Sequence, residues 1–107
     1  MRPVRRALVS AAALALAACG GERAPRVHQV AIERFVFAAD TVPVAPGDTV
    51  VFTNRDAVPH TATAASGAWD SGEIAAGGTW RLVVPADGAG GYTCRYHPTM
   101  RGALTAE

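Results

Sequence analysis

The sequence has no lysine, and it has little of several other residues on which common functions depend. All ten basic residues among its 107 are arginines, and there are only three histidines and two cysteines. Beyond residue 19 seven arginines are outnumbered by nine acidic residues, which gives a formal net charge of −2 and no basic cluster. A nucleic-acid partner is therefore not expected, because binding the phosphate backbone needs clustered positive charge.

The chain also lacks the patterns of common enzyme active sites. It has no glycine-rich phosphate-binding loop, no His-Glu-x-x-His motif, and no serine with a suitable histidine and aspartate. Three histidines are too few to bind the additional copper ions of a multicopper oxidase. We therefore do not predict an enzyme.

Only one long apolar run is present, at residues 7–18, and it is interrupted only by Ser10. Its twelve residues are too few for a helix that spans a bilayer, but they suit an export signal, and three arginines precede them. The run ends in Leu16-Ala17-Ala18-Cys19, which resembles a bacterial lipobox, in which the cysteine is lipidated. An ordinary signal peptide cut nearby is the alternative.

We therefore predict three segments: a lipoprotein signal peptide at residues 1–18, a lipidated Cys19 with a flexible tether over residues 19–26, and a folded domain over residues 27–107. Such a protein is extracytoplasmic, either periplasmic or at the cell surface, and is anchored to a membrane by its lipid. The other cysteine, Cys94, then has no disulfide partner in an oxidising compartment. Metal binding is one function that a single cysteine of this kind can have.

Apolar and polar residues alternate through the predicted domain, with glycine, proline and aspartate between the alternating stretches. No stretch has a sustained 3.6-residue apolar period, so helices are not expected. Val30 and Ile32 share one face of a strand, and Phe35 and Phe37 continue the alternation after a one-residue slip, which we interpret as a β-bulge. Further strands are predicted at residues 49–54, 60–64, 79–84, 91–94 and 101–106. This pattern is typical of an all-β sandwich.

Four residues have side chains that bind metals: Cys94, His97 and Met100, each separated from the next by two residues, and His60 upstream. Taken singly, a cysteine is more often an inert buried thiol and a methionine more often fills a core. Together they offer one thiolate, two imidazoles and one thioether, the donors of a mononuclear blue-copper site. Zinc is not favoured, because a thioether is a poor ligand for zinc. The third histidine, His28, is expected at the surface.

Several longer motifs surround these residues. They are Tyr92-Thr93-Cys94-Arg95-Tyr96-His97-Pro98-Thr99-Met100-Arg101-Gly102, Pro46-Gly47-Asp48-Thr49-Val50, Val58-Pro59-His60-Thr61 and Trp69-Asp70-Ser71-Gly72. Through them the chain resembles the cupredoxins, and most closely the amicyanin and plastocyanin-like group. Two positions depart from that pattern: many cupredoxins have asparagine where this chain has Thr61, and amicyanin has proline where it has Tyr96.

The resemblance implies a cupredoxin-like Greek-key β-sandwich that binds one copper ion and cycles it between Cu(I) and Cu(II). The expected ligands are His60, Cys94 and His97, with Met100 as a weak axial donor. Thr61 is expected to form hydrogen bonds around these ligands. Asn54, at the end of a predicted strand, either forms hydrogen bonds to the ligand loops or serves only in a turn. The protein is then expected to be a monomer that carries single electrons between two extracytoplasmic redox proteins, a donor and an acceptor.

The exposed edge of His97 is the expected electron port. An apolar docking patch is expected around it, formed by Ala57, Val58, Pro59 and Pro98, with Pro46 as a further candidate. The alternative function is a copper chaperone or copper-storage protein that delivers metal to an exported enzyme, because the same ligands would serve it. The closed four-ligand site favours the electron carrier.

Overall fold

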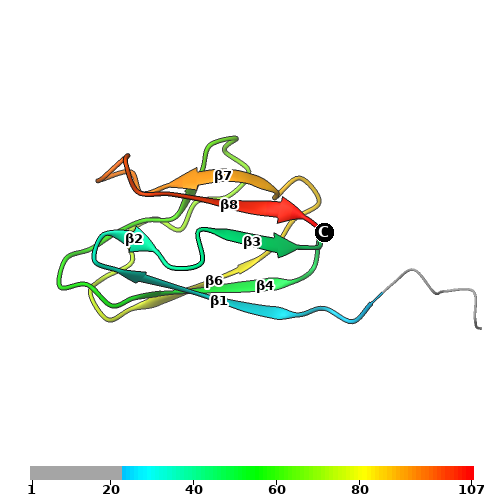
Figure 1. The fold of residues 1–107 in the computed structure, drawn as a ribbon, viewed down its shortest axis with the longest axis horizontal. Coiled ribbons are helices and arrows are strands. Elements are labelled where there is room, and N and C mark those ends of the chain that lie inside the picture. The colour runs from blue at the N-terminus through cyan, green and yellow to red at the C-terminus, as the bar shows by residue number, and fades with distance from the viewer. Residues whose placement is uncertain (1–22) are drawn as a thin grey trace, which may run out of the picture.

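The computed structural model describes residues 23–107 as a sandwich of two four-stranded β-sheets (Figure 1). The strands are β1 (Val27–Glu33), β2 (Val36–Phe37), β3 (Thr41–Val44), β4 (Thr49–Asn54), β5 (Thr63–Ala64), β6 (Thr79–Val83), β7 (Gly90–Thr93) and β8 (Arg101–Ala106). The all-β sandwich is therefore confirmed. The predicted signal peptide and Cys19 lie outside the described residues. Within residues 23–107, no helix is long and apolar enough to cross a membrane.

The first sheet has the order β2-β1-β4-β6, and β4 is one of its two inner strands. Strand β1 pairs with β4 in parallel, from Val27 opposite Thr49 to Ile32 opposite Asn54. Strand β6 pairs with the other edge of β4 in the antiparallel direction. Parallel pairing carries β1 and β4 toward the same end of the sandwich, where both strands stop.

The second sheet has the order β3-β8-β7-β5. Strand β7 runs antiparallel to β8, and the segment that joins them contains the cysteine motif. Strand β3 was not predicted, because Pro43 lies within a run of only four residues and argues against a strand. It is tolerated here because β3 is an edge strand, where a missing amide hydrogen leaves no buried acceptor unpaired.

Aromatic rings fill the space between the two sheets. The ring of Phe52 lies 5.5 Å from that of Tyr92, 5.9 Å from that of Trp80 and 6.1 Å from that of Trp69, measured between centroids. Phe37 packs edge-on against Tyr92 at 4.7 Å. These contacts fall in the range favourable for aromatic pairs, so the sheets are joined by a rigid core that fixes the positions of the strand ends.

The predicted β-bulge after Ile32 is wrong, and the structure has a tight hairpin there. Ile32 pairs with Phe37 in the antiparallel direction, and two residues, Arg34 and Phe35, make the turn. Both have positive φ angles, 58° and 59°, as a two-residue type I′ turn requires. The turn moves Phe35 out of the core, and its side chain is 48% exposed.

The strand predicted at residues 60–64 is shorter in the structure. Only Thr63–Ala64 forms β5, and His60 instead makes an isolated bridge with Ile74. The bridge consists of two hydrogen bonds, from the Ile74 amide to the His60 carbonyl at 2.8 Å and from the His60 amide to the Ile74 carbonyl at 3.2 Å. The backbone of His60 is therefore fixed although it lies outside a strand.

The sandwich has two ends with different contents (Figure 1). The hairpin end holds the β1–β2 turn, the segment after β4 and the β7–β8 loop. The terminal end holds the start of β1, the β3–β4 turn and the C-terminus. The candidate ligands therefore gather at the hairpin end.

Candidate metal centre

Three of the four predicted ligands converge at the hairpin end. The ligating atoms of His60, Cys94 and His97 all lie within 4.8 Å of one another. The Cys94 sulfur is 3.7 Å from Nδ1 of His60 and 3.7 Å from Nδ1 of His97. One ion can bind the sulfur and an imidazole nitrogen at once. A metal–sulfur bond of about 2.3 Å and a metal–nitrogen bond of about 2.0 Å together exceed the 3.7 Å that separates these two atoms. Among the described residues this is the only such cluster of histidine, cysteine and acidic side chains.

The β7–β8 loop supplies two of these residues and Met100 because it closes on itself. The His97 amide donates to the Cys94 carbonyl at 3.2 Å, and the Met100 amide donates to the His97 carbonyl at 2.9 Å. The Cys94 amide then donates to the Met100 carbonyl at 3.3 Å. Cys94 and Met100 are buried, so a thiol and a thioether are held in one compact turn away from water.

His60 lies in the segment that leads from β4 to β5, and its side chain is oriented by a carboxylate. Its side chain is fully buried, and its Nε2 lies 2.8 Å from Oδ2 of Asp56. Burial of Asp56 opposes ionisation, but hydrogen bonds from the Phe35 and Arg34 amides and from His60 outweigh it and lower the Asp56 pKa. An ionised Asp56 accepts a hydrogen bond from the protonated Nε2. The lone pair of Nδ1 is then directed at the cysteine, as metal ligation requires.

Thr61 connects His60 to the cysteine loop. Its amide donates to the Cys94 sulfur at 3.3 Å, and its hydroxyl accepts from the Arg95 amide at 2.8 Å. A hydrogen bond to sulfur stabilises a thiolate, because it favours the charged form. Threonine at this position therefore joins the two ligand-bearing segments directly.

Asn54, at the end of β4, holds the segment that leads to His60. Its side-chain amide donates to the carbonyls of Val58 at 2.9 Å and Ile74 at 3.0 Å, and its oxygen accepts from the Asp56 amide at 3.0 Å. Because Asn54 is fully buried, these three bonds leave the segment little freedom. Asn54 thus orients His60 through the backbone rather than by touching the ligand atoms.

The outer side of the cysteine loop is tied to the segment after Trp69. Arg95 forms an ion pair with Asp70 at 2.7 Å, and the Tyr96 hydroxyl donates to Glu73 at 3.1 Å. The hydrogen bond to Glu73 raises the Tyr96 pKa. Tyr96 occupies the position where amicyanin has proline, so this chain restrains the loop by side-chain contacts.

Phe35 is a site residue that the sequence analysis missed. Its ring lies edge-on against both histidine rings, with centroids 5.1 Å from His60 and 5.0 Å from His97. The slip in the alternating pattern was the only signal at this position. An Arg-Phe pair does not suggest a hairpin turn, because type I′ turns usually contain asparagine, aspartate or glycine.

The residues predicted to form the docking patch are exposed on the two loops of the hairpin end. They are Ala57, Val58, Pro59 and Pro98, and Val58 is 38% exposed.

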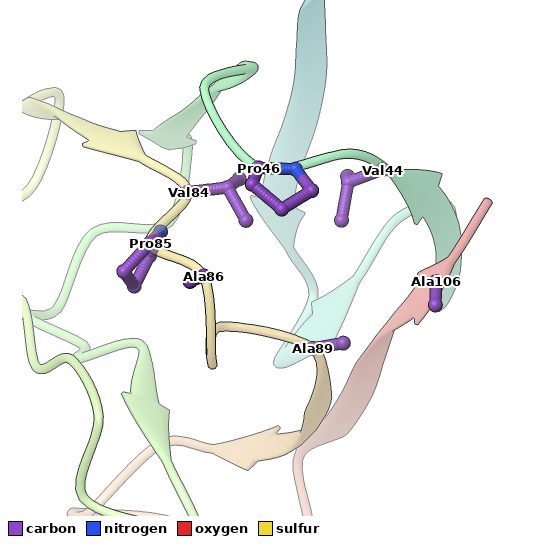
Figure 2. Close-up of a pocket in the computed structure, with 7 residues that line it drawn as sticks. All are labelled: Val44, Pro46, Val84, Pro85, Ala86, Ala89 and Ala106. Carbon is purple, nitrogen blue, oxygen red and sulfur yellow. The ribbon is translucent and has the colours of Figure 1, made fainter. Parts of the chain in front are cut away.

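Pro46 does not belong to this group. It lies in the β3–β4 turn at the terminal end, where it lines a small apolar hollow of about 110 Å³. Figure 2 shows this hollow, with Val44, Pro46, Val84, Pro85, Ala86, Ala89 and Ala106 around it. The sequence around a single turn proline does not indicate at which end of the sandwich the turn will lie.

Comparison with known proteins identifies the architecture. No protein-family model matches the chain, and no curated protein sequence does. Among solved structures, a methionine mutant of amicyanin in its Cu(I) form is 27% identical, over 81% of this chain and 88% of that chain, with a TM-score of 0.69. This chain has the cupredoxin fold.

Two other solved cupredoxins show how widely this architecture is shared. Amicyanin from Paracoccus versutus is 24% identical over 76% of this chain and 81% of that chain, with a TM-score of 0.65. A purple cupredoxin from Nitrosopumilus maritimus is 23% identical over 75% of this chain and 99% of that chain, with a TM-score of 0.65. The cupredoxin fold of this chain brings together the His/Cys/His/Met donor set of a type-1 copper site.

Proposed function

We propose that this protein is a type-1 copper protein that carries single electrons between extracytoplasmic redox proteins and is not an enzyme. In this proposal Cys94, His60 and His97 bind the ion strongly and Met100 is the weak axial donor. The observation that carries the proposal is the convergence of three donor atoms from two separate loops within 4.8 Å. Bound copper supplies one-electron chemistry between Cu(I) and Cu(II).

The surroundings of the donors favour electron transfer. Fast transfer requires ligands that move little between oxidation states, and here each donor is restrained by a separate contact. Asp56 orients His60, the Thr61 amide meets the Cys94 sulfur, and the closed loop positions His97. Of the three side chains only His97 is partly exposed, so its outer edge is the proposed electron port.

The proposal includes export and a lipid anchor. The apolar run at residues 7–18 and the lipobox-like Leu16-Ala17-Ala18-Cys19 support them. Amicyanin-like proteins are periplasmic, which agrees with export. Metabolic labelling with a tagged fatty acid tests the anchor, since Cys19→Ser abolishes the label if Cys19 is its site.

The metal assignment is tested by adding one equivalent of Cu(II) to the purified domain. We expect an intense visible thiolate-to-copper absorption and an EPR spectrum with the small copper hyperfine splitting of a type-1 site. Cys94→Ala abolishes the absorption, because it removes the sulfur donor. Retention of the colour in that variant overturns the assignment. Rapid loss of copper to a chelator without redox cycling indicates the chaperone or storage function instead.

A further inference from the structure

The turn of the β1–β2 hairpin brings an exposed aromatic side chain against the candidate ligands. The Phe35 ring meets the ring of His60 at an interplanar angle of 90° and that of His97 at 85°. The two imidazoles are themselves only 5.2 Å apart. The Phe35 ring therefore packs against both histidine rings, in the edge-to-face geometry that aromatic pairs favour.

The turn that carries Phe35 is held in a conformation that its residues disfavour. Positive φ angles of 58° at Arg34 and 59° at Phe35 are costly for bulky side chains. Asp56 compensates by accepting hydrogen bonds from both amides, at 2.6 Å from Arg34 and 2.9 Å from Phe35. The same carboxylate binds Nε2 of His60, so Asp56 fixes the turn and the histidine relative to each other.

We propose that Phe35 is a fixed aromatic cover over His60 and His97 that restricts the access of water and competing ligands to the metal ion. Phe35 is itself 48% exposed, so it stands between solvent and the two imidazoles. This inference rests on the proposed copper-binding function and sharpens it. A cover that slows metal exchange suits a carrier that keeps its ion and is a disadvantage for a chaperone that must release it.

The first test uses the copper-free full chain and the variant Phe35→Gly. Glycine removes the ring and is unstrained at a positive φ, so the turn is retained when the cover is lost. Far-UV circular dichroism checks the fold. We expect diethyl pyrocarbonate to modify His60 and His97 faster by about five- to a hundredfold, the range that corresponds to two lost aromatic contacts. His28, at the terminal end, is the internal control in the peptide mass spectra and should react at an unchanged rate.

The second test measures transfer of Cu(I) from the loaded protein to bathocuproine disulfonate. Phe35→Gly should transfer copper faster by a similar factor, and Phe35→Leu, which keeps an apolar side chain of comparable size, should restore most of the protection. Val36→Ala is the matched control, because Val36 is 54% exposed on the same hairpin and has no aromatic ring to pair with the histidines. It should behave as the unmodified chain.

The two tests separate failure of the cover from failure of the proposed function. A chain that binds no copper refutes the proposed function, and the modification rates still decide whether Phe35 protects the histidines. Unchanged rates at His60 and His97 in Phe35→Gly overturn the cover. An equal increase in Val36→Ala also overturns it, because the effect would then belong to the hairpin as a whole.

Discussion

Each end of the sandwich holds an aspartate bonded to a histidine, and the two pairs differ in what else they contact. At the hairpin end, Oδ2 of Asp56 lies 2.8 Å from Nε2 of His60. At the terminal end, Oδ2 of Asp48 lies 2.9 Å from Nε2 of His28. In both pairs the carboxylate binds the same ring nitrogen at nearly the same distance.

The terminal pair belongs to an ionic network around the buried carboxylate of Asp48. Arg23 donates to both oxygens of Asp48, at 3.0 and 2.9 Å, and the amides of Arg26 and Ala45 donate at 2.9 and 3.1 Å. These hydrogen bonds, led by the one from Arg23 and followed by that from His28, hold the Asp48 pKa far below its usual range. Arg23 lies within the segment predicted to be a tether, so the ordered contacts of the domain begin before Val27.

The difference lies in what else surrounds each aspartate–histidine pair. Nδ1 of His60 points at a thiol that a second imidazole also approaches, and this is the only such cluster in the described chain. The carboxylate of Asp48 instead receives five hydrogen bonds, and its network includes no cysteine. An aspartate–histidine pair is therefore not a functional site by itself. Its neighbours decide whether it orients a ligand or stabilises the fold.

The largest effect on stability is expected from Asp48→Ala. The change leaves Arg23 and two backbone amides without their acceptor, and breaking a partly buried ionic network is destabilising. We expect the thermal midpoint of the copper-free protein to fall by about 5–10 °C, measured by circular dichroism. The visible spectrum of the copper-loaded variant at low temperature should be unchanged. A lost or shifted copper band would show that the two ends are not independent.

Asp56→Asn should weaken copper binding and have a smaller effect on thermal stability. It retains the size of the side chain but weakens the acceptor that orients His60. We expect copper affinity to fall by about 10–100-fold, the usual effect of losing such a partner of a metal ligand, measured by competition with a chelator. The thermal midpoint of the copper-free variant should fall less than in Asp48→Ala. Equal losses of stability in the two variants would remove the distinction between the ends.

Acid sharpens the same comparison. The folded-state pKa of Asp48 is lowered from its ordinary value of 3.8, so its contribution to stability is complete above that value and is lost as the pH falls below it. Arg23 and His28 face the carboxylate, and Glu107 binds Arg23. Urea denaturation between about pH 5 and pH 2 should therefore show a shallower loss of stability in Asp48→Asn than in the unmodified chain. Parallel curves would contradict this assignment.

Apart from His60, which stands in a motif of its own, the predicted ligands are residues whose spacing is local. Cys94, His97 and Met100 lie on one short loop, so a motif reveals them, and β4 and β8 have clear signals. Phe35 joins the site because of an unusual turn at a pair of residues with no turn preference. His28 was expected at the surface, but its side chain is only 18% exposed. It forms a hydrogen bond with Asp48, which is 20 residues away in the sequence. Contacts that depend on how two distant segments meet leave no pattern in one sequence.

The smallest effect is expected between the two ends, at Tyr92. Its ring lies in the aromatic core, its hydroxyl has no hydrogen-bond partner among the described residues, and burial raises its pKa. Tyr92→Phe removes an unpaired buried hydroxyl while retaining the ring, so the free energy of unfolding should stay the same or rise by up to about 1 kcal/mol. Urea denaturation measures this, and the copper spectrum should not change. A loss of more than about 1 kcal/mol would show that the hydroxyl has a partner, such as a buried water. The Tyr92 hydroxyl would then stabilise the core between the two ends by a hydrogen bond, in addition to the packing of its ring.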